Sequence, residues 1–354
     1  MQIKKKECFM KRVVIGMSGG VDSSVAAYLL KQQGYDVVGL FMKNWDCESA
    51  EPDFNDVKRV CEKIGIPYYA VNFQKQYMES VFDEFLNGLK MGWTPNPDIL
   101  CNKEIKFGVF LQYAAKLNAD YVATGHYCKI ENGTLCRADD ETKDQSYFLC
   151  ALTKQQLEKV IFPLSHIKKT EVRKIAAQLG FINSAKKDST GICFIGEQKI
   201  KNFLKTYLGT KIGQIRTLDD KIVGSHDGLM YYTIGQRKGL NIGGINSNTK
   251  RWFVVKKDLS NNVLYVNNGD CKELYSNKIL LQNFNSFFNF IQISCTAKVR
   301  YRQTDQICIA KNIENKEVEV TFLEKQRAVT LGQWCVLYNK EKCLGGGIIS
   351  AILS

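Results

Sequence analysis

The residues best suited to chemistry form a glycine- and serine-rich stretch near the N-terminus, Gly16-Met17-Ser18-Gly19-Gly20-Val21-Asp22-Ser23-Ser24. The apolar run Arg12-Val13-Val14-Ile15 precedes it and is typical of a buried parallel strand. Apolar residues then recur at helical spacing as far as Gly34, which suits a helix C-terminus. The stretch is therefore predicted to join a strand to a helix N-terminus, where free N–H groups and the helix dipole favour a bound anion.

Side chains of this stretch add groups that phosphate chemistry needs. Ser18, Ser23 and Ser24 offer hydroxyl donors, and Asp22 is suited to a metal ion that bridges phosphate oxygens. A Walker A loop is excluded because the stretch has no lysine, and the dinucleotide fingerprint Gly-x-Gly-x-x-Gly is absent from it. The string resembles the pyrophosphate loop of ATP pyrophosphatases, which cleave ATP between the α and β phosphates and adenylate a substrate oxygen. The alternative is a tight turn that binds nothing.

A second candidate site lies in the stretch from Gly92 to Lys103. Its two prolines, at i and i+2, are expected to prevent helix and to stiffen a loop that presents Asp98 and Cys101 near the start of the next helix. A helix N-terminus lowers the pKa of a thiol, and Lys103 and Lys106 would add to the effect. Cys101 is thus a candidate reactive thiolate with Asp98 as proton acceptor, and a buried structural cysteine is the alternative.

Three further polar stretches are candidates for ligand contact. Cys193 is predicted to lie in a loop bounded by two glycines. Gly125 closes a predicted strand and allows close backbone approach, and the adjacent His126 is either a ligand contact or a structural histidine. The run Lys143-Asp144-Gln145-Ser146-Tyr147 is predicted to contact RNA or nucleotide at the ligand edge of the sheet, or to be a solvated helix start.

Charge and cysteine content limit the function class. The 354-residue chain has a net charge of +13, which favours a polyanionic partner, nucleic acid before an anionic membrane, although solubilising surface lysines explain part of the charge. The 13 cysteines include no Cys-x-x-Cys pair and the three histidines are far apart, which argues against a structural zinc site or an iron–sulfur cluster. We expect a reducing cytoplasm and no membrane segment, because the chain has neither a signal-peptide pattern nor an apolar run of about 18 residues.

The positions of apolar residues predict an α/β fold. Strands are expected at Asp36–Met42, Tyr68–Phe73 and Asp120–Thr124, and helices from the N-cap Asp53 to about Gly65, over 78–89 and over about 103–117. Such alternation predicts a doubly wound parallel sheet with ligands at the carboxyl ends of its strands. After about residue 205, short β-rich runs and turn pairs predict a small central β domain and a β-barrel. The expected domains are a basic extension 1–11, an α/β domain 12–204 that contains the glycine- and serine-rich stretch, a small central β domain 205–270 and a β-barrel domain 271–354.

The motifs together are specific. In chain order they are the Gly16–Ser24 stretch, Thr94-Pro95-Asn96-Pro97-Asp98-Ile99-Leu100-Cys101-Asn102, Ala123-Thr124-Gly125-His126-Tyr127, Lys143–Tyr147, Ser189-Thr190-Gly191-Ile192-Cys193-Phe194 and Tyr232-Thr233-Ile234-Gly235-Gln236-Arg237-Lys238-Gly239-Leu240. From about residue 12 onward the chain resembles the tRNA-specific 2-thiouridylases.

The resemblance implies an ATP-dependent 2-thiolation of the wobble uridine, position 34, of tRNA. Uracil O2 would be adenylated with ATP and Mg, and Asp22 would be a candidate ligand of the metal. A persulfide on Cys193, supplied by a cysteine desulfurase or sulfur relay protein, would then deliver sulfur to C2. Cys101 would act as nucleophile and close a transient disulfide with Cys193, and Asp98 would transfer a proton. Implied ATP contacts are Gly16, Met17, Ser18, Gly19, Gly20, Val21, Asp22, Ser23, Met42 and Gly125. Implied tRNA contacts are Asn96, Pro97, Asp98, His126, Lys143, Asp144, Gln145, Arg300, Tyr301 and Gln333.

One RNA-binding surface is predicted from spacing alone. Lys298, Arg300 and Arg302 alternate with apolar or aromatic residues, which on a strand would place three cations on one face. A solvated basic face is the alternative. Two rival functions are an amide-forming ATP pyrophosphatase, similar to GMP or NAD synthetases, and an RNA-binding module without catalysis. The first leaves Cys101, Cys193 and the positive charge unexplained, and the second leaves the intact Ser18–Ser23 string unexplained.

Overall fold

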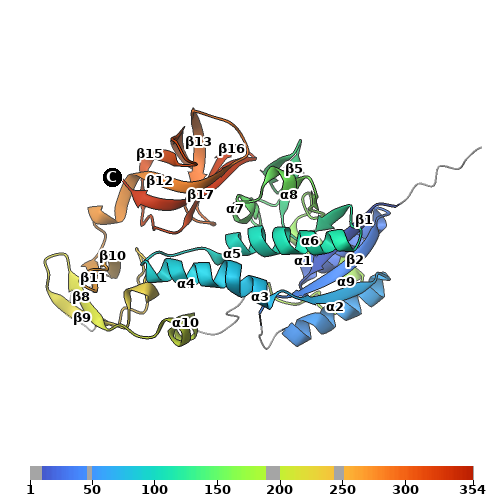
Figure 1. Ribbon diagram of the computed structural model, residues 1–354, viewed down its shortest axis with the longest axis horizontal. Coiled ribbons are helices and arrows are strands. Elements are labelled where there is room, and N and C mark those ends of the chain that lie inside the picture. The colour runs from blue at the N-terminus through green and yellow to red at the C-terminus, as the bar shows by residue number, and fades with distance from the viewer. Residues whose placement is uncertain (1–9, 46–49, 189–199, 243–250, 354) are drawn as a thin grey trace, which may run out of the picture. The chain divides into compact units, whose positions relative to one another are not determined.

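The computed structural model describes residues 10–45, 50–188, 200–242 and 251–353 (Figure 1). The chain forms two compact units, one of residues up to Met78 with Asp98–Gly196, and the other of Glu79–Pro97 with Glu197–Ser354. No helix in the described parts of the chain is both long and apolar enough to span a bilayer.

A parallel five-stranded sheet organises the first unit, with strand order β3-β2-β1-β4-β7. The strands are β1 (Arg12–Met17), β2 (Asp36–Lys43), β3 (Tyr68–Asn72), β4 (Tyr121–Ala123) and β7 (Val160–Ile161). The chain leaves β1 toward β2 and β3, and returns on the other side of β1 as β4. The loop after β1 therefore lies at the topological switch point, where open α/β sheets bind ligands.

Helices cover both faces of this sheet, as a doubly wound fold requires. Val13, Ile15 and Met17 of β1 share a core with α1 (Val21–Gln32), α2 (Ala50–Ile64) and α9 (Lys169–Gln178). Side chains alternate along a strand, so Gly16 points to the opposite face, where Phe110 of α6 (Phe110–Lys116) approaches it. The predicted fold class is confirmed. Asp53, however, lies inside α2, so the N-cap prediction is wrong.

The helix that carries Asp98 and Cys101 begins earlier than the sequence indicated. Helix α5 (Pro97–Leu100) continues into a π-helical segment (Cys101–Val109) and then into α6. The expected stiff loop around Asp98 and Cys101 is therefore wrong: both residues are helical. A proline is compatible with the first helical turn, because its missing N–H would have no partner there.

The remaining elements of the first unit are short. They are α3 (Gln74–Tyr77), the hairpin of β5 (Cys128–Glu131) and β6 (Thr134–Arg137), α7 (Ser146–Leu149) and α8 (Lys154–Leu157). The Thr153 side chain caps α8 in a capping box with Gln156. The expected amphipathic helix over 78–89 is present as a π-helical segment (Met78–Phe82) followed by α4 (Asp83–Lys90).

The second unit contains a four-stranded sheet of order β10-β11-β8-β9. Its elements are α10 (Ile200–Leu208), β8 (Gly213–Thr217), β9 (Ile222–His226), a 3₁₀ turn (Leu229–Tyr231), β10 (Trp252–Asp258) and β11 (Val263–Asn268). Ile215, Val254 and Leu264 are fully buried in its core.

A six-stranded antiparallel barrel follows in the same unit. A 3₁₀ turn (Lys272–Leu274) leads into β12 (Tyr275–Ser286), β13 (Gln292–Lys298), β14 (Gln306–Asn312), β15 (Val318–Arg327), β16 (Trp334–Asn339) and β17 (Lys342–Ile352). Pairing runs β12-β15-β14-β13-β16-β17, and β17 pairs with β12 to close the barrel. The predicted barrel is confirmed.

The predicted basic strand face in this barrel is wrong. Strand β13 ends at Lys298, and Arg300 and Arg302 lie in the turn that follows. Lys298 forms an ion pair with Asp305 at 3.6 Å. Alternate residues share a face only while the strand continues, and here the strand ends at the first of the three cations, so spacing alone could not predict their arrangement.

Candidate active site

The loop after β1 has the geometry of an anion-binding helix start. Gly19 has a φ of +74°, and a Cβ there would lie 2.6 Å from the carbonyl oxygen of Asp53. Gly20 precedes α1 and offers no side-chain cap. The Ser23 and Ser24 hydroxyls donate to the Gly20 carbonyl oxygen at 3.1 and 2.9 Å. The first N–H groups of α1 thus lie at a loop whose small residues leave room for a ligand.

Two predicted nucleotide contacts lie beside this loop. A Cβ on Gly16 would be 3.0 Å from the methyl carbon of Met42, at the carboxyl end of β2. A Cβ on Gly125 would be 2.7 Å from the backbone nitrogen of Ser23. Position 125 therefore admits only glycine if the turn after β4 is to pack against the start of α1.

Asp22 is held by two groups from distant parts of the chain. The Tyr127 hydroxyl donates to Oδ1 at 2.7 Å, and Lys169 Nζ lies 2.7 Å from Oδ1 and 2.6 Å from Oδ2. Lys169 is the first residue of α9, and its ammonium also lies 2.8 Å from Asp188. The ion pairs with Lys143 and Lys169 help to lower the pKa of Asp188 to about 2, although burial opposes them.

A second lysine holds the loop from the side of α2. Lys186 Nζ donates to Asp53 at 2.7 Å, to Asp56 at 2.6 Å and to the Gly19 carbonyl oxygen at 3.3 Å. The Asn183 amide donates to the same carbonyl oxygen and to the Ser24 hydroxyl, each at 2.9 Å. Residues 183–188 therefore form one wall of the candidate site around the loop Ser18–Ser24, which we call the phosphate-loop site.

Sequence reasoning missed Lys169 and Lys186, because nothing local connects them to the loop. One signal was present for Lys169: a lysine at a helix start opposes the helix dipole and needs a reason. The donor set suits a magnesium ion bound together with ATP, because Asp22 supplies carboxylate oxygens beside serine hydroxyls. Among the described residues no three His, Cys, Asp or Glu side chains gather as a metal site.

Asp98 and Cys101 are three residues apart on one helix and so share a face. Cys101 is almost fully buried, at 1% exposure, and begins the π-helical segment, a helix type that is frequent at functional sites. Lys103 pairs with Glu104 at 2.9 Å. All ten cysteines in the described part of the chain are free thiols, and nine of them are buried.

Asp98 and His126 share the electrostatic influence of Lys106. Burial raises the pKa of Asp98, and the charge of Lys106 partly opposes this shift. Burial and the same lysine hold the pKa of His126 well below its usual value, so the imidazole is neutral near pH 7. Its Nδ1 lies 2.7 Å from the Thr124 hydroxyl. The structure thus brings a carboxyl with raised proton affinity, a buried thiol and a neutral imidazole into one unit.

Comparison with known proteins adds an independent finding. Residues 11–197 match a family model described as tRNA methyl transferase HUP domain, 201–268 a tRNA methyl transferase PRC-barrel domain, and 276–349 an aminomethyltransferase beta-barrel domain. A tRNA-specific 2-thiouridylase of Geobacillus kaustophilus is 54% identical over 97% of this chain and 96% of its own length. The enzyme of the same name from Bacillus subtilis is 54% identical over 96% of this chain and 95% of its own. The chain belongs to the tRNA-specific 2-thiouridylase family.

Solved structures give only a weak likeness. The U34-tRNA thiolase from Methanococcus maripaludis matches with a TM-score of 0.36 and 23% identity, over 56% of this chain and 67% of that one.

Three predicted tRNA contacts lie near the phosphate-loop site. Lys143 pairs with Asp188 at 2.8 Å. Asp144 is buried and accepts hydrogen bonds from the backbone and hydroxyl of Ser146 at 3.1 and 2.9 Å. Gln145 exchanges hydrogen bonds with the Tyr127 backbone at 3.0 and 2.8 Å. Lys143 differs from the other two in that its charged side chain is half-exposed. Asp144 and Gln145 bond to neighbouring groups of the chain.

The other predicted tRNA contacts belong mainly to the second unit. Gln333 donates to the Thr94 carbonyl oxygen at 2.5 Å, which ties the barrel to the segment just before Asn96 and Pro97. The Arg300 guanidinium donates to the carbonyl oxygens of Arg327 and Ala328. Tyr301, which is half-buried, follows it in the same turn. Cys193 lies outside the described residues.

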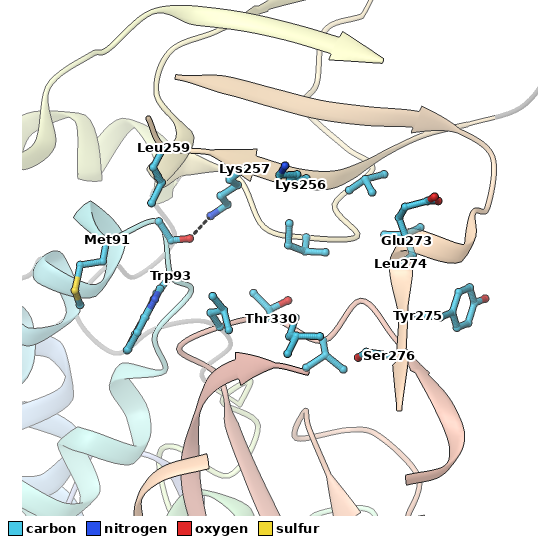
Figure 2. Close-up of a pocket in the computed structure, with 16 residues that line it drawn as sticks. Met91, Trp93, Lys256, Lys257, Leu259, Glu273, Leu274, Tyr275, Ser276 and Thr330 are labelled. Atoms are coloured by element: carbon cyan, nitrogen blue, oxygen red, sulfur yellow. Dashed lines mark hydrogen bonds between the residues drawn. The ribbon is translucent and has the colours of Figure 1, made fainter. Parts of the chain in front are cut away.

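A pocket of about 270 Å³ lies within the second unit (Figure 2). Its walls are mostly apolar and come from the segment after α4, the end of β10 and the start of β12. Figure 2 shows Lys257 pointing toward the segment that carries Trp93, and its Nζ donates to the Gly92 carbonyl oxygen at 2.8 Å. Burial lowers the pKa of Lys257 to about 8. No carboxylate in the described chain pairs with it.

Proposed function

We propose that the protein is an ATP-dependent tRNA uridine 2-sulfurtransferase that replaces O2 of the wobble uridine, position 34, with sulfur. The observation that carries the proposal is 54% identity over almost the whole chain to 2-thiouridylases. The phosphate loop at the switch point and the shared helix of Asp98 and Cys101 fit this chemistry. The rival amide-forming function would leave Cys101 without a role.

The first chemical step activates a poor leaving group. Uracil O2 attacks the α phosphorus of ATP, an O–P bond forms, and the bond to the β-phosphate oxygen breaks to release pyrophosphate. The N–H groups of α1 and the Ser18 and Ser23 hydroxyls would hold the phosphates. A magnesium ion bound with ATP would neutralise phosphate charge, and Asp22 is the residue that would hold it. Met42 and Gly125 would lie around the adenosine.

The second step delivers sulfur as a nucleophile. The terminal sulfur of a Cys193 persulfide attacks C2 and AMP leaves with the former O2. The Cys101 thiolate then attacks Cys193 Sγ, the S–S bond breaks, and its electron pair stays on the sulfur bound to C2. A Cys101–Cys193 disulfide results, and an external dithiol must reduce it. Asp98, whose pKa burial raises, would accept the proton released along this path.

Chain length is compatible with this role for Cys193. Asp188 is fixed beside the phosphate loop through Lys169, and five residues extend at most about 18 Å. A separation of five residues from Asp188 is therefore short enough for the proposed sulfur delivery. The persulfide would come from a cysteine desulfurase or a sulfur relay protein, and Asn96-Pro97-Asp98 would meet the target base. The remaining proposed tRNA contacts are His126, Lys143, Asp144, Gln145, Arg300, Tyr301 and Gln333.

The proposal is tested with purified protein, unmodified tRNA, Mg-ATP and a persulfide donor. Mass spectrometry of digested tRNA should show 2-thiouridine, and AMP and pyrophosphate should form only when tRNA is present. Pyrophosphate release that needs ammonia but not tRNA would instead indicate an amide former. A methylated uridine in the same digest would instead indicate a tRNA methyltransferase, the activity named in the description of the matching family model. Binding of tRNA without either product would indicate a non-catalytic module.

A further inference from the structure

We propose that Lys169 is a phosphate-binding residue of the nucleotide site, whose ammonium contacts the triphosphate of ATP beside the N-terminus of α1. This inference rests on the proposed function and adds to it a residue that lies outside every motif of the sequence. Lys169 is separated from Asp22 by 147 positions, yet its Nζ lies within 2.7 Å of both carboxylate oxygens. Because Asp22 is the second residue of α1, the ammonium lies at the helix end where an anion binds.

The local electrostatics argue against a purely structural ion pair. A cation is unfavourable at a helix N-terminus, and Lys169 lies at two of them, its own in α9 and that of α1. The lysine side chain is only 9% exposed, whereas the Asp22 side chain is 31% exposed. Burying an ammonium there carries a desolvation free energy that offsets the attraction of the ion pair, so the pair alone would add little to the stability of the fold. A polyanionic ligand would be favoured by both helix ends and by the lysine.

Asp188 gives Lys169 a second anionic partner, so the ammonium can bind a ligand without moving. Its carboxylate lies 2.8 Å from the ammonium, and Lys143 and Arg173 hold it in turn at 2.8 and 2.9 Å. If Asp22 turns to a magnesium ion that arrives with ATP, Lys169 keeps Asp188 as an anionic partner. The remaining N–H donors of the ammonium are then directed to the phosphates. A lysine is suited to this task as a compact point charge.

The experiment measures equilibrium binding of ATP, pyrophosphate and adenosine by calorimetry, with Mg²⁺ and without tRNA. Lys169→Met should weaken ATP and pyrophosphate binding by about 10- to 100-fold, the range for a charged hydrogen bond, and leave adenosine unchanged. Lys169→Arg should restore most of the affinity for pyrophosphate. Lys174→Met is the matched control, because it removes an exposed cation of the same helix that pairs with Glu171 rather than with Asp22 or Asp188, and its ATP affinity should equal that of the wild type.

Two results would overturn the inference. ATP affinity that is unchanged in Lys169→Met would show that the lysine does not reach the phosphates. Equal losses for ATP and adenosine would show that it only holds the fold. If Lys169→Met does not fold, Lys169→Arg provides the test. Measurable pyrophosphate binding with unaltered adenosine binding would support the contact. Loss of both pyrophosphate and adenosine binding would contradict it. Binding of ATP and pyrophosphate to the wild type is measured without tRNA. This experiment can therefore succeed even if the proposed thiolation of tRNA does not occur.

Discussion

The Tyr127 hydroxyl donates a 2.7 Å hydrogen bond to Oδ1 of Asp22, although the two residues are 105 positions apart. Tyr127 is almost fully buried, and burial together with Asp22 raises the pKa of its phenol, so the hydroxyl keeps its proton at any physiological pH. The bond is therefore a fixed donor that orients the carboxylate. It ties the turn after β4 to the first turn of α1.

This relationship gives the first prediction. Tyr127→Phe removes the donor but keeps the ring, so stability should fall by only about 1 kcal/mol. Asp22 would lose one of the groups that orient it, and tRNA-dependent pyrophosphate release should slow by about tenfold. Tyr121→Phe, which removes a tyrosine hydroxyl elsewhere in the same unit, is a suitable control. A wild-type rate in Tyr127→Phe would show that the bond has no part in adenylation.

The second prediction concerns the pH dependence of thiolation. Burial raises the pKa of Asp98 above its usual 3.8, so its carboxylate gains a proton at a higher pH than an exposed aspartate. If Asp98 is the proton acceptor, the rate should fall as pH drops through this raised pKa. Asp98→Asn should be slow and should lack that acidic limb. An acidic limb that persists in the variant would assign it to another group.

The stability of the second unit should respond to Lys257. Burial lowers the pKa of this lysine from 10.5 to about 8, so between these values the unfolded chain binds more protons than the folded chain. The free energy of unfolding should therefore rise with pH across this window, and the full cost of the buried charge is present below about pH 8.

A substitution isolates this effect. Lys257→Met should stabilise the protein at pH 7 by roughly 1–2 kcal/mol, after the loss of the bond to the Gly92 carbonyl oxygen, and should flatten the rise above pH 8. Urea unfolding followed by tryptophan fluorescence measures both, since Trp93 lines the same pocket. Lys256→Met, the exposed neighbour, should change neither quantity. A destabilised Lys257→Met would mean that the ammonium is well solvated.

Much of the fold was predictable because it depends on local pattern. Buried β-branched strands, helical periodicity and Gly34 with its φ of +83° each act within a few residues. The turn that joins β1 to the start of α1 was predictable for the same reason. Lys169 and Lys186 were not, because only the fold brings them to the loop. The start of the Cys101 helix was misjudged because a proline that ends a helix can also begin one.

The turn after β13 changes what the basic cluster is expected to do. Lys298 pairs with Asp305, and Arg300 bonds to backbone carbonyl oxygens, whereas no ion pair of Arg302 is found among the described residues. If this turn meets tRNA phosphates, Arg302→Ala should flatten the plot of log affinity against log salt by about 0.7 to 0.9. Lys298→Ala should change the slope much less. Equal slopes for wild type and Arg302→Ala would exclude a phosphate contact at this residue.

Cys193 is proposed to carry the sulfur and Cys101 to release it to the product. A sulfane-sulfur transfer assay on single variants tests these two roles most directly. Cys193→Ser should never take up labelled sulfane sulfur from a donor, because a hydroxyl cannot carry it. Cys101→Ser should load sulfur and adenylate tRNA, yet release no 2-thiouridine. Cys61→Ala, which removes a buried thiol of α2, should load and thiolate at the wild-type rate with only a packing cost. Thiolation of tRNA by Cys193→Ser at the wild-type rate would contradict the account.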